Sequence, residues 1–191
     1  MDQLVVGGGM ANTFLLAKGF TVGASLVERD FVATAKGIMA RADESGCEVV
    51  LPIDVVVAKE LKPGAAWQLC GAGNVPSEGM ILDFGPKSLA ELRRRLGQVK
   101  TVLWNGPLGA FETPPFGEGT FALAREVARL TKSGKLVSVA GGGDTVRALN
   151  EAHVAEDFSY VSTAGGAFLE WLGGAQLPGV VALARSGSRT H

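Results

Sequence analysis

Short apolar runs in this sequence repeatedly end in a cluster of glycines and are followed by helical periodicity. The chain has 191 residues and 27 glycines, and many of these stand at such junctions rather than in a low-complexity linker. The clearest clusters are Gly7-Gly8-Gly9, Gly141-Gly142-Gly143 and Gly165-Gly166. Strands that alternate with helices predict a parallel sheet, because a parallel connection needs a crossover helix.

The predicted fold class is therefore α/β, with a three-layer, Rossmann-like parallel sheet and helices on both faces. Residues 62–79 lack a sustained period and predict a loop or a short hairpin. The expected strands are 4–6, 48–51, 55–58, 101–104, 136–140 and 158–161. The expected helices are 10–18, 28–45, 86–96, 120–132, 145–151 and 167–172.

Composition limits the class of protein. Hydrophobic residues make up 47% of the chain, which is enough for one well-buried domain over residues 1–183, followed by a polar tail over 184–191. A net charge of −1 argues against nucleic acid as a partner. No apolar run is long enough to span a membrane. Cys47 and Cys70 are too far apart in sequence to form a ligand-spaced pair, so a reducing, cytoplasmic location is expected.

The glycine clusters predict a site at one edge of the sheet. Ligands of open parallel sheets bind beyond the carboxyl ends of the strands. Glycine lets the backbone approach a ligand closely, and the helix that follows adds the positive end of its dipole. Together these features favour phosphate, although each cluster taken alone is also compatible with a simple tight turn.

The group from Gly141 to Thr145 carries the most specific chemistry. Its glycine amides would face phosphate oxygens, and the Thr145 hydroxyl could donate to one of them. Asp144 offers the hard oxygen ligands that Mg²⁺ takes together with phosphates and water. The same aspartate could instead cap the helix that follows.

A second group, from Asn105 to Glu112, follows another expected strand. Asn105 can donate to phosphate, and Glu112 can accept hydrogen bonds from ribose hydroxyls, as acidic residues do in nucleotide sites. The alternative is an ordinary turn with a solvated glutamate. The G-x-x-x-x-G-K-[ST], G-x-G-x-x-G, H-R-D and D-F-G signatures are all absent, and the two histidines stand alone.

The residues resemble one family, the phosphoglycerate kinases, over almost the whole chain. Six motifs occur in the family's order: Gly7-Gly8-Gly9-Met10-Ala11-Asn12-Thr13-Phe14, Leu51-Pro52-Ile53-Asp54-Val55-Val56, Leu82-Asp83-Phe84-Gly85-Pro86, Trp104-Asn105-Gly106-Pro107-Leu108-Gly109, Gly141-Gly142-Gly143-Asp144-Thr145 and Leu177-Pro178-Gly179-Val180. The resemblance implies phosphoryl transfer between 1,3-bisphosphoglycerate and ADP, giving 3-phosphoglycerate and ATP, by a monomeric parent protein. It implies that this chain is the C-terminal domain, which holds the magnesium-bound ADP or ATP.

The same resemblance implies a role for each candidate residue. Those that would line the adenine pocket are Gly8, Gly9, Leu26, Leu61 and Leu82. Those that would meet the rest of the nucleotide are Pro107 and Glu112 at the adenosine, Asn105, Gly142, Gly143 and Thr145 at the phosphates, and Asp144 at the magnesium. Those whose backbone would lie near the transferred phosphoryl group are Gly143, Gly165 and Gly166.

Three departures from the family pattern stand out. Ile81 and Ala164 occupy positions that are usually glycine. The chain also begins inside the family's C-terminal domain, without the preceding strand and its lysines and without the N-terminal domain that holds phosphoglycerate. We therefore expect an incomplete domain that is inactive alone. The alternatives are a non-catalytic nucleotide-binding module and a Rossmann dehydrogenase domain, and the absent fingerprint argues against the second.

Overall fold

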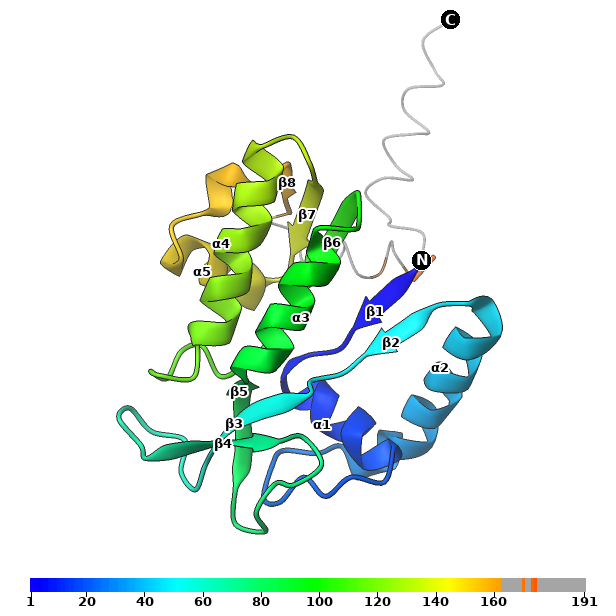
Figure 1. Ribbon diagram of the computed structural model, residues 1–191, viewed down its shortest axis with the longest axis vertical. Coiled ribbons are helices and arrows are strands. Elements are labelled where there is room, and N and C mark those ends of the chain that lie inside the picture. The colour runs from blue at the N-terminus through cyan, green and yellow to red at the C-terminus, as the bar shows by residue number, and fades with distance from the viewer. Residues whose placement is uncertain (163–169, 171–172, 175–191) are drawn as a thin grey trace, which may run out of the picture.

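The computed structural model describes residues 1–162, 170 and 173–174, which form an α/β arrangement (Figure 1). The strands are β1 Gln3–Val5, β2 Glu48–Val50, β3 Asp54–Ala58, β4 Trp67–Gly71, β5 Met80–Phe84, β6 Thr101–Asn105, β7 Val137–Gly141 and β8 Tyr160–Val161. The helices are α1 Gly8–Ala17, α2 Val32–Ser45, α3 Pro86–Leu96, α4 Glu118–Lys132 and α5 Gly143–Glu151, with 3₁₀ turns η1 Arg29–Phe31 and η2 Ala155–Asp157.

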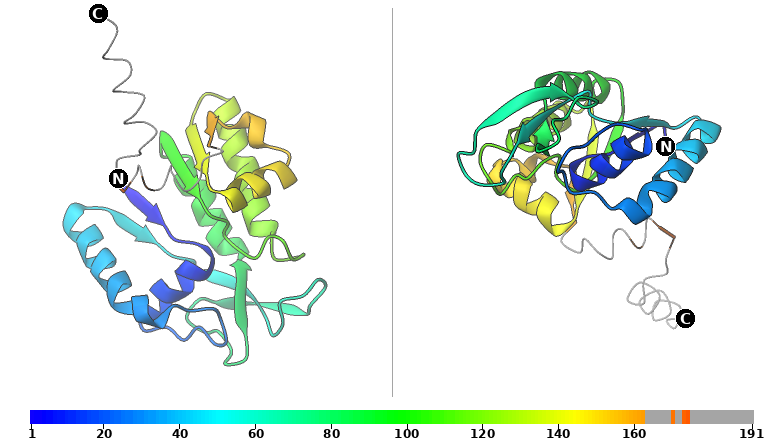
Figure 2. Two further views of the ribbon diagram at one scale, coloured as in Figure 1. Left: turned by 180° about the vertical axis from the view of Figure 1, so that it is seen from behind. Right: turned by 90° about the horizontal axis from the view of Figure 1, so that it is seen from below.

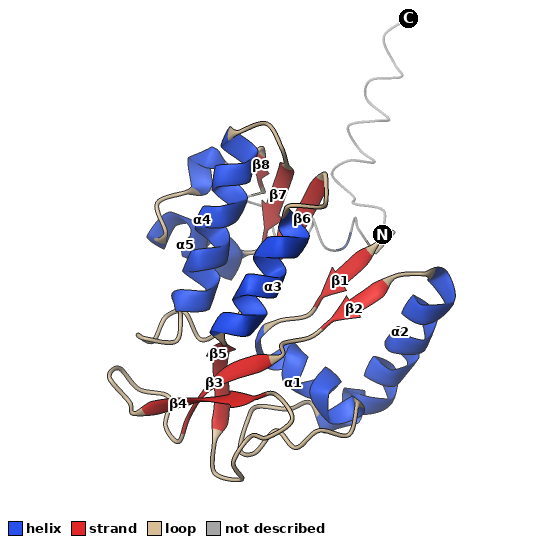
Figure 3. Cartoon of the chain, in the orientation of Figure 1, coloured by secondary structure: helices blue, strands red, loops and turns tan. Residues whose placement is uncertain are grey.

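The strands form three small sheets, which Figure 3 shows in red. β1 pairs with β2 in parallel, and β6, β7 and β8 form a second parallel sheet. The third sheet is antiparallel, with β3 as its central strand between β4 and β5. The α/β class is confirmed, but a single all-parallel sheet is not what the described residues form. A buried apolar strand has the same sequence pattern in either direction, so the pattern could not reveal the antiparallel pairing.

The 62–79 segment forms the predicted hairpin rather than a plain loop. Its strand β4 is mostly exposed and lies at the edge of the antiparallel sheet. The third strand of that sheet, β5, was not predicted as a strand. Its residues are progressively more buried along the strand instead of alternating, so no period of two marks it.

Helices cover both faces of the sheet at β2, as the sequence predicted. Val50 packs in a cluster with Leu92 and Leu96 of α3, whereas Val49 packs against Phe14 of α1 and Ala35 of α2. Neighbouring residues of a strand point to opposite faces, so these two contacts place α3 on one side and α1 with α2 on the other. Figure 2 shows the two groups of helices separated in the view from below.

The second parallel sheet has a covered and an uncovered face within the described part of the chain. Trp104 and Ala140 pack with Val127 of α4 in the largest hydrophobic cluster. On the opposite face, Leu103 and Tyr160 keep 44% and 60% of their surface exposed. Central parallel strands are normally buried on both sides, so the described helices account for only one of the two layers expected here.

Helix α2 begins later than the sequence predicted. A 3₁₀ turn precedes it, and Phe31, which was expected on its apolar face, is 55% exposed. Ala35 and Ala42 are buried as predicted. The helix ends at Gly46, whose φ of 70° gives the left-handed C-terminal turn that glycine adopts without strain. Within the part of the chain that the structure describes, none of the helices combines the length and apolar character needed to cross a lipid bilayer.

A buried carboxylate fixes the start of α3 to β3. Asp54 Oδ1 accepts from the backbone N–H of Ser88 (2.8 Å), and its Oδ2 accepts from the N–H of Lys87 (3.1 Å). The Ser88 hydroxyl accepts from the N–H groups of Ile53 (2.9 Å) and Asp54 (3.0 Å), and donates to the Asp54 carbonyl (2.7 Å). These bonds satisfy the helix N-terminus and bind it to the strand.

Removing this hydroxyl should destabilise the fold. Ser88→Ala leaves the buried N–H of Asp54 and the partly buried N–H of Ile53 without this acceptor, and we expect the free energy of unfolding to fall by about 1–3 kcal/mol. Urea denaturation followed by circular dichroism measures it. Ser77→Ala is the matched control, because Ser77 is exposed and should change stability by less than about 0.5 kcal/mol. Equal midpoints for the two variants would contradict the role of Ser88.

Candidate functional site

The turn between β7 and α5 holds four of the predicted phosphate and metal residues. Gly142 is the N-cap of α5, and its φ of 95° is a conformation that residues with side chains rarely adopt. A Cβ at this position would also lie 2.7 Å from Asn105 Nδ2. The first helical hydrogen bond joins Val146 N to Gly142 O (2.9 Å), so the amides of residues 143–145 precede it. These amides and the helix dipole favour an anion here.

Asn105 and Thr145 join this turn to the end of β6 and to the residue that follows β6. Asn105 Nδ2 donates to the carbonyl of Gly141 (2.8 Å), and Thr145 Oγ1 accepts from the N–H of Gly106 (2.7 Å). Both side chains therefore have a structural bond besides the phosphate contact predicted for them. Asn105 is exposed and retains a second N–H, whereas the Thr145 side chain is buried.

Asp144 lies in the first turn of α5 with its side chain exposed. The N-cap is Gly142 and no side chain caps the helix, so the alternative that Asp144 serves as the cap is wrong. Within the described residues its carboxylate has no hydrogen bond or ion pair. The structure therefore leaves both of its oxygens available to a cation, while the helix dipole favours its negative charge.

The turn between β1 and α1 forms a second wall of the site. Gly8 has a φ of 59° and donates its N–H to the carbonyl of Leu108 (3.0 Å). A Cβ on Gly8 would lie 3.3 Å from the carbonyl of Pro107, and one on Gly9 would lie 3.4 Å from the side chain of Leu26. Four residues predicted at the adenine and adenosine are thus neighbours, and Leu26 presents 76% of its surface to solvent.

The remaining predicted pocket residues are placed differently. Leu82 is buried in a cluster with Ala58 and Phe116, so only the edge of its side chain is open. Leu61 is 52% exposed in the chain that follows β3. Ile81, at a position that is usually glycine, packs against the cluster that contains Leu15 of α1, and its bulk is accommodated there.

The loop of residues 106–117, between β6 and α4, connects these parts. The Ala110 N–H donates to the carbonyl of Leu82 on β5 (2.8 Å). The Leu108 N–H donates to Thr120 Oγ1 of α4 (3.0 Å), and Asp83 Oδ2 accepts from the N–H of Gly119 at the start of α4 (2.8 Å). The loop is therefore bound at both of its ends and in its middle.

Glu112 projects from this loop into solvent. Its neighbour Phe111 is buried, contacts Phe121 edge-on with ring centroids 6.4 Å apart, and lies 5.3 Å beneath the Arg147 guanidinium. The Glu112 side chain is exposed and makes no hydrogen bond or ion pair within the described residues. It is thus a free acceptor on a fixed backbone, which is what recognition of a ribose hydroxyl requires.

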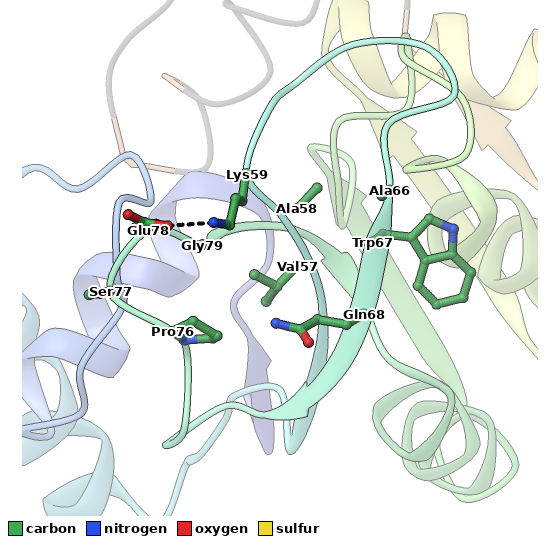
Figure 4. A pocket seen from close by; sticks show the side chains of 10 residues that line it. All are labelled: Val57, Ala58, Lys59, Ala66, Trp67, Gln68, Pro76, Ser77, Glu78 and Gly79. Atoms are coloured by element: carbon green, nitrogen blue, oxygen red, sulfur yellow. Dashed lines mark hydrogen bonds and ion pairs between the residues drawn. The ribbon is translucent and has the colours of Figure 1, made fainter.

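A shallow hollow elsewhere on the surface involves none of these residues. It lies between the β3–β4 hairpin and the turn at residues 76–79, and the exposed pair Lys59–Glu78 (2.5 Å) bridges its rim (Figure 4). Figure 4 shows Trp67 pointing away from the other lining side chains. The hollow is open and lacks the convergent polar groups of a ligand site.

Comparison with known proteins identifies the family. A family model described as phosphoglycerate kinase matches residues 1–175. The chain belongs to the phosphoglycerate kinase family.

Curated relatives support this membership, and the chain matches only part of the length of each. A phosphoglycerate kinase of Cereibacter sphaeroides is 60% identical over 183 residues, which is 96% of this chain and 46% of that protein. One from Mesorhizobium japonicum is 58% identical over 185 residues, or 97% of this chain and 46% of the relative. The chain thus spans about half the length of the curated relatives it matches.

Solved structures agree. The phosphoglycerate kinase of Coxiella burnetii superposes with a TM-score of 0.87 at 43% identity, over 92% of this chain and 44% of that one. The phosphoglycerate kinase of Pyrococcus horikoshii superposes with a TM-score of 0.80 at 25% identity, over 98% of this chain and 46% of that one.

The predicted residues Gly165 and Gly166, together with Ala164 and the 184–191 tail, lie outside the residues that the structure describes.

The structure also brings in residues that sequence reasoning did not assign to the site. Thr120 is bonded to the 106–117 loop, Asp83 is bonded to the start of α4 where that loop ends, and Asn12 Nδ2 donates to the carbonyl of Leu26 (3.1 Å). Asn12 Oδ1 has no hydrogen-bond partner among the described residues, although it is buried. A polar residue inside an apolar strand or helix is the signal that could have singled out Asp83 and Asn12.

The Asp83 carboxyl is in an unusual electrostatic environment. Burial raises its pKa to about 7 from the ordinary value of 3.8, with a smaller rise from the Glu118 carboxylate, while the N–H groups of Gly119 and Phe84 lower it. Its side chain is only 2% exposed. The loss of hydration therefore exceeds the help from two hydrogen bonds, and the group changes charge near neutral pH.

This pKa predicts a specific pH dependence. Between the two pKa values the folded protein holds a proton that the unfolded chain has released, so stability falls as pH rises towards 7 and is level above it. From about pH 5 to pH 7 the free energy of unfolding should fall by about 2–3 kcal/mol because of this group. Asp83→Asn has no titrating group at this position and should not show this part of the fall. Urea denaturation of both proteins across this range measures it, and a stability difference that is independent of pH would contradict it.

Proposed function

We propose that this chain is the nucleotide-binding, C-terminal domain of a phosphoglycerate kinase. It would hold Mg-ADP or Mg-ATP during phosphoryl transfer between 1,3-bisphosphoglycerate and ADP, which yields 3-phosphoglycerate and ATP. Family membership supports the reaction. The observation that carries the nucleotide assignment is that the α1 turn, the α5 turn and the 106–117 loop are hydrogen bonded together at the carboxyl ends of three strands.

The chemistry of the groups fits the parts of a nucleotide. Gly8, Gly9 and Leu26 offer close backbone and apolar surface to the adenine. Glu112, on the same loop as Pro107, offers the ribose a carboxylate that is free within the described residues. The N-terminal amides of α5 offer donors to the phosphates. Contacts of this kind position the phosphoryl groups and neutralise their charge, which is most of what catalysis of phosphoryl transfer needs.

Asp144 fits the role of the magnesium ligand. Mg²⁺ in nucleotide sites is commonly held by one or two carboxylates, together with phosphate oxygens and water. Asp144 supplies one exposed carboxylate that has no partner among the described residues, at the helix end that would receive the phosphates. The ion would neutralise charge on the phosphate oxygens. For Gly165 and Gly166, the proposal rests on the family resemblance alone.

The phosphoglycerate would be held by another part of the full-length protein. The chain covers 46% of its relatives, and the resemblance assigns the acceptor site to the N-terminal domain. A non-catalytic nucleotide-binding module is the second candidate, favoured by the same coverage. The two differ in whether the nucleotide bound here is turned over when the remainder of a phosphoglycerate kinase is present.

The first test measures binding and turnover by the 191-residue chain. We expect one Mg-ADP site by calorimetry. At about 100 times Kd, Mg-ADP should stabilise the chain by about 2.7 kcal/mol, which corresponds to a rise in Tm of roughly 5–10 °C. A coupled kinase assay should show no turnover by this chain alone. The absence of both heat and thermal shift would refute the nucleotide assignment, and turnover would refute the assignment of phosphoglycerate to another domain.

The second test isolates Asp144. Asp144→Asn should weaken ADP binding about tenfold in the presence of magnesium, because a charged ligand to the ion is lost. In excess chelator Asp144→Asn should not weaken ADP binding and should strengthen it several-fold, because the carboxylate then only repels the phosphates. Asp43→Asn removes the same charge from an exposed position on α2 and serves as the control. Equal weakening with and without magnesium would show that Asp144 acts on the nucleotide in some other way.

A further inference from the structure

Asp83 is a buried carboxylate for which the proposed nucleotide contacts give no role. It lies on β5, and only 2% of its surface is exposed. Its Oδ2 accepts from the N–H of Gly119 at the start of α4 (2.8 Å), and its Oδ1 accepts from the N–H of Phe84 (2.8 Å). Burial of an ionisable group costs desolvation free energy, so its presence at this position indicates that it has a role.

Two glycines pack directly on this carboxylate. A Cβ on Gly109 would lie 2.5 Å from both Asp83 Oδ1 and the Leu82 carbonyl oxygen, and a Cβ on Gly119 would lie 2.4 Å from Asp83 Oδ1. Neither glycine has a positive φ, so space rather than backbone conformation requires glycine at both positions. Gly109 lies in the 106–117 loop, and Gly119 lies just beyond its end, so the loop is shaped around Asp83.

The part of the loop between these glycines carries Glu112. The Glu112 side chain has no bond of its own in the described residues, so its position follows from the backbone that carries it. That backbone is held by the bond from Gly119 N–H to Asp83, by the bond from Ala110 N–H to Leu82, by the bond from Gly64 N–H to Pro114 and by the buried ring of Phe111. Asp83 acts at both ends of the segment, because Gly109 also packs on its carboxylate.

We propose that Asp83 is a positioning residue for nucleoside recognition, which holds the 106–117 loop so that Glu112 can reach the ribose hydroxyls. The inference rests on the proposed function, in which Glu112 meets the ribose. Asp83 itself does not touch the nucleotide. Its loss should therefore reduce recognition of the ribose hydroxyls selectively, and leave binding of the phosphates at α5 in place.

The chain contains a closely matched control. Asp54 on β3 is also buried, and it accepts from the N–H groups of Lys87 and Ser88 at the start of α3. A Cβ on Gly85 would lie 2.4 Å from the Asp54 Cγ. Each of the two aspartates thus fixes a strand to the N-terminus of a helix, but Asp54 is bonded to α3, whereas Asp83 is bonded to α4 where the 106–117 loop ends.

The experiment compares ADP with 2′,3′-dideoxy-ADP, both with magnesium, by calorimetry on the 191-residue chain. We expect the native chain to bind ADP about tenfold more tightly, as for hydrogen bonds to a charged acceptor. In Asp83→Asn the ratio of the two Kd values should fall close to one. In Asp54→Asn it should stay near the native value, although that variant is also less stable. Circular dichroism checks that each variant is folded at the temperature of the titration.

Gly119→Ala provides an independent variant with the carboxylate intact. Its added methyl group displaces the loop from Asp83 and should lower the ratio in the same way, and it decides the question if Asp83→Asn does not fold. A native chain that binds neither ligand would overturn the proposed function. A native chain that binds the two ligands equally would overturn the assignment of Glu112 to the ribose, and with it the role of Asp83. A native ratio that survives in Asp83→Asn or in folded Gly119→Ala, or that Asp54→Asn also abolishes, would overturn the role of Asp83 alone.

Discussion

The 106–117 loop is hydrogen bonded to structures that follow or belong to each of the three sheets. Leu108 accepts from the N–H of Gly8 after β1, Ala110 donates to Leu82 on β5, and Gly106 donates to Thr145 after β7. The strands of different sheets do not pair with one another among the described residues, so these bonds set the relative positions of the turns at the site. Because folding already orders this loop, a ligand does not have to supply the free energy for ordering it.

The residues of the site divide into buried supports and exposed groups. Thr120 and Thr145 are buried and bonded to the loop, and Asp83 is buried and bonded to the start of α4 where the loop ends. Glu112 and Asp144 are exposed and have no partner within the described residues. A ligand that binds the exposed groups breaks no protein hydrogen bond in doing so. The supports keep their positions through packing and hydrogen bonds that do not involve the ligand, and this is the usual basis of a preorganised site.

The sequence predicted those features that depend on local pattern. The turn at Gly142 was foreseen because three glycines follow an apolar run, and the positive φ at Gly142 is the reason that glycine is needed there. Gly109 and Gly119 have no such conformation, and the atoms that exclude a side chain from them belong to Leu82 and Asp83, far away in sequence. No local pattern contains that information. The antiparallel direction of β3 and the structural bond of Thr145 were missed for the same reason, since both depend on which segments meet in space.

Two opposing electrostatic effects meet at the start of α5, where the phosphates are proposed to bind. The amides at the start of α5 favour an anion, yet Asp144 places a negative charge in the same helical turn. Two like charges about 4 Å apart repel each other by about 1 kcal/mol in water and by more where water is excluded. A divalent cation between the carboxylate and the phosphates turns this repulsion into two attractions. In the proposed function the site would therefore take a nucleotide together with its metal ion rather than a free polyphosphate. That role would account for a carboxylate at a helix end that would otherwise bind phosphate better without it.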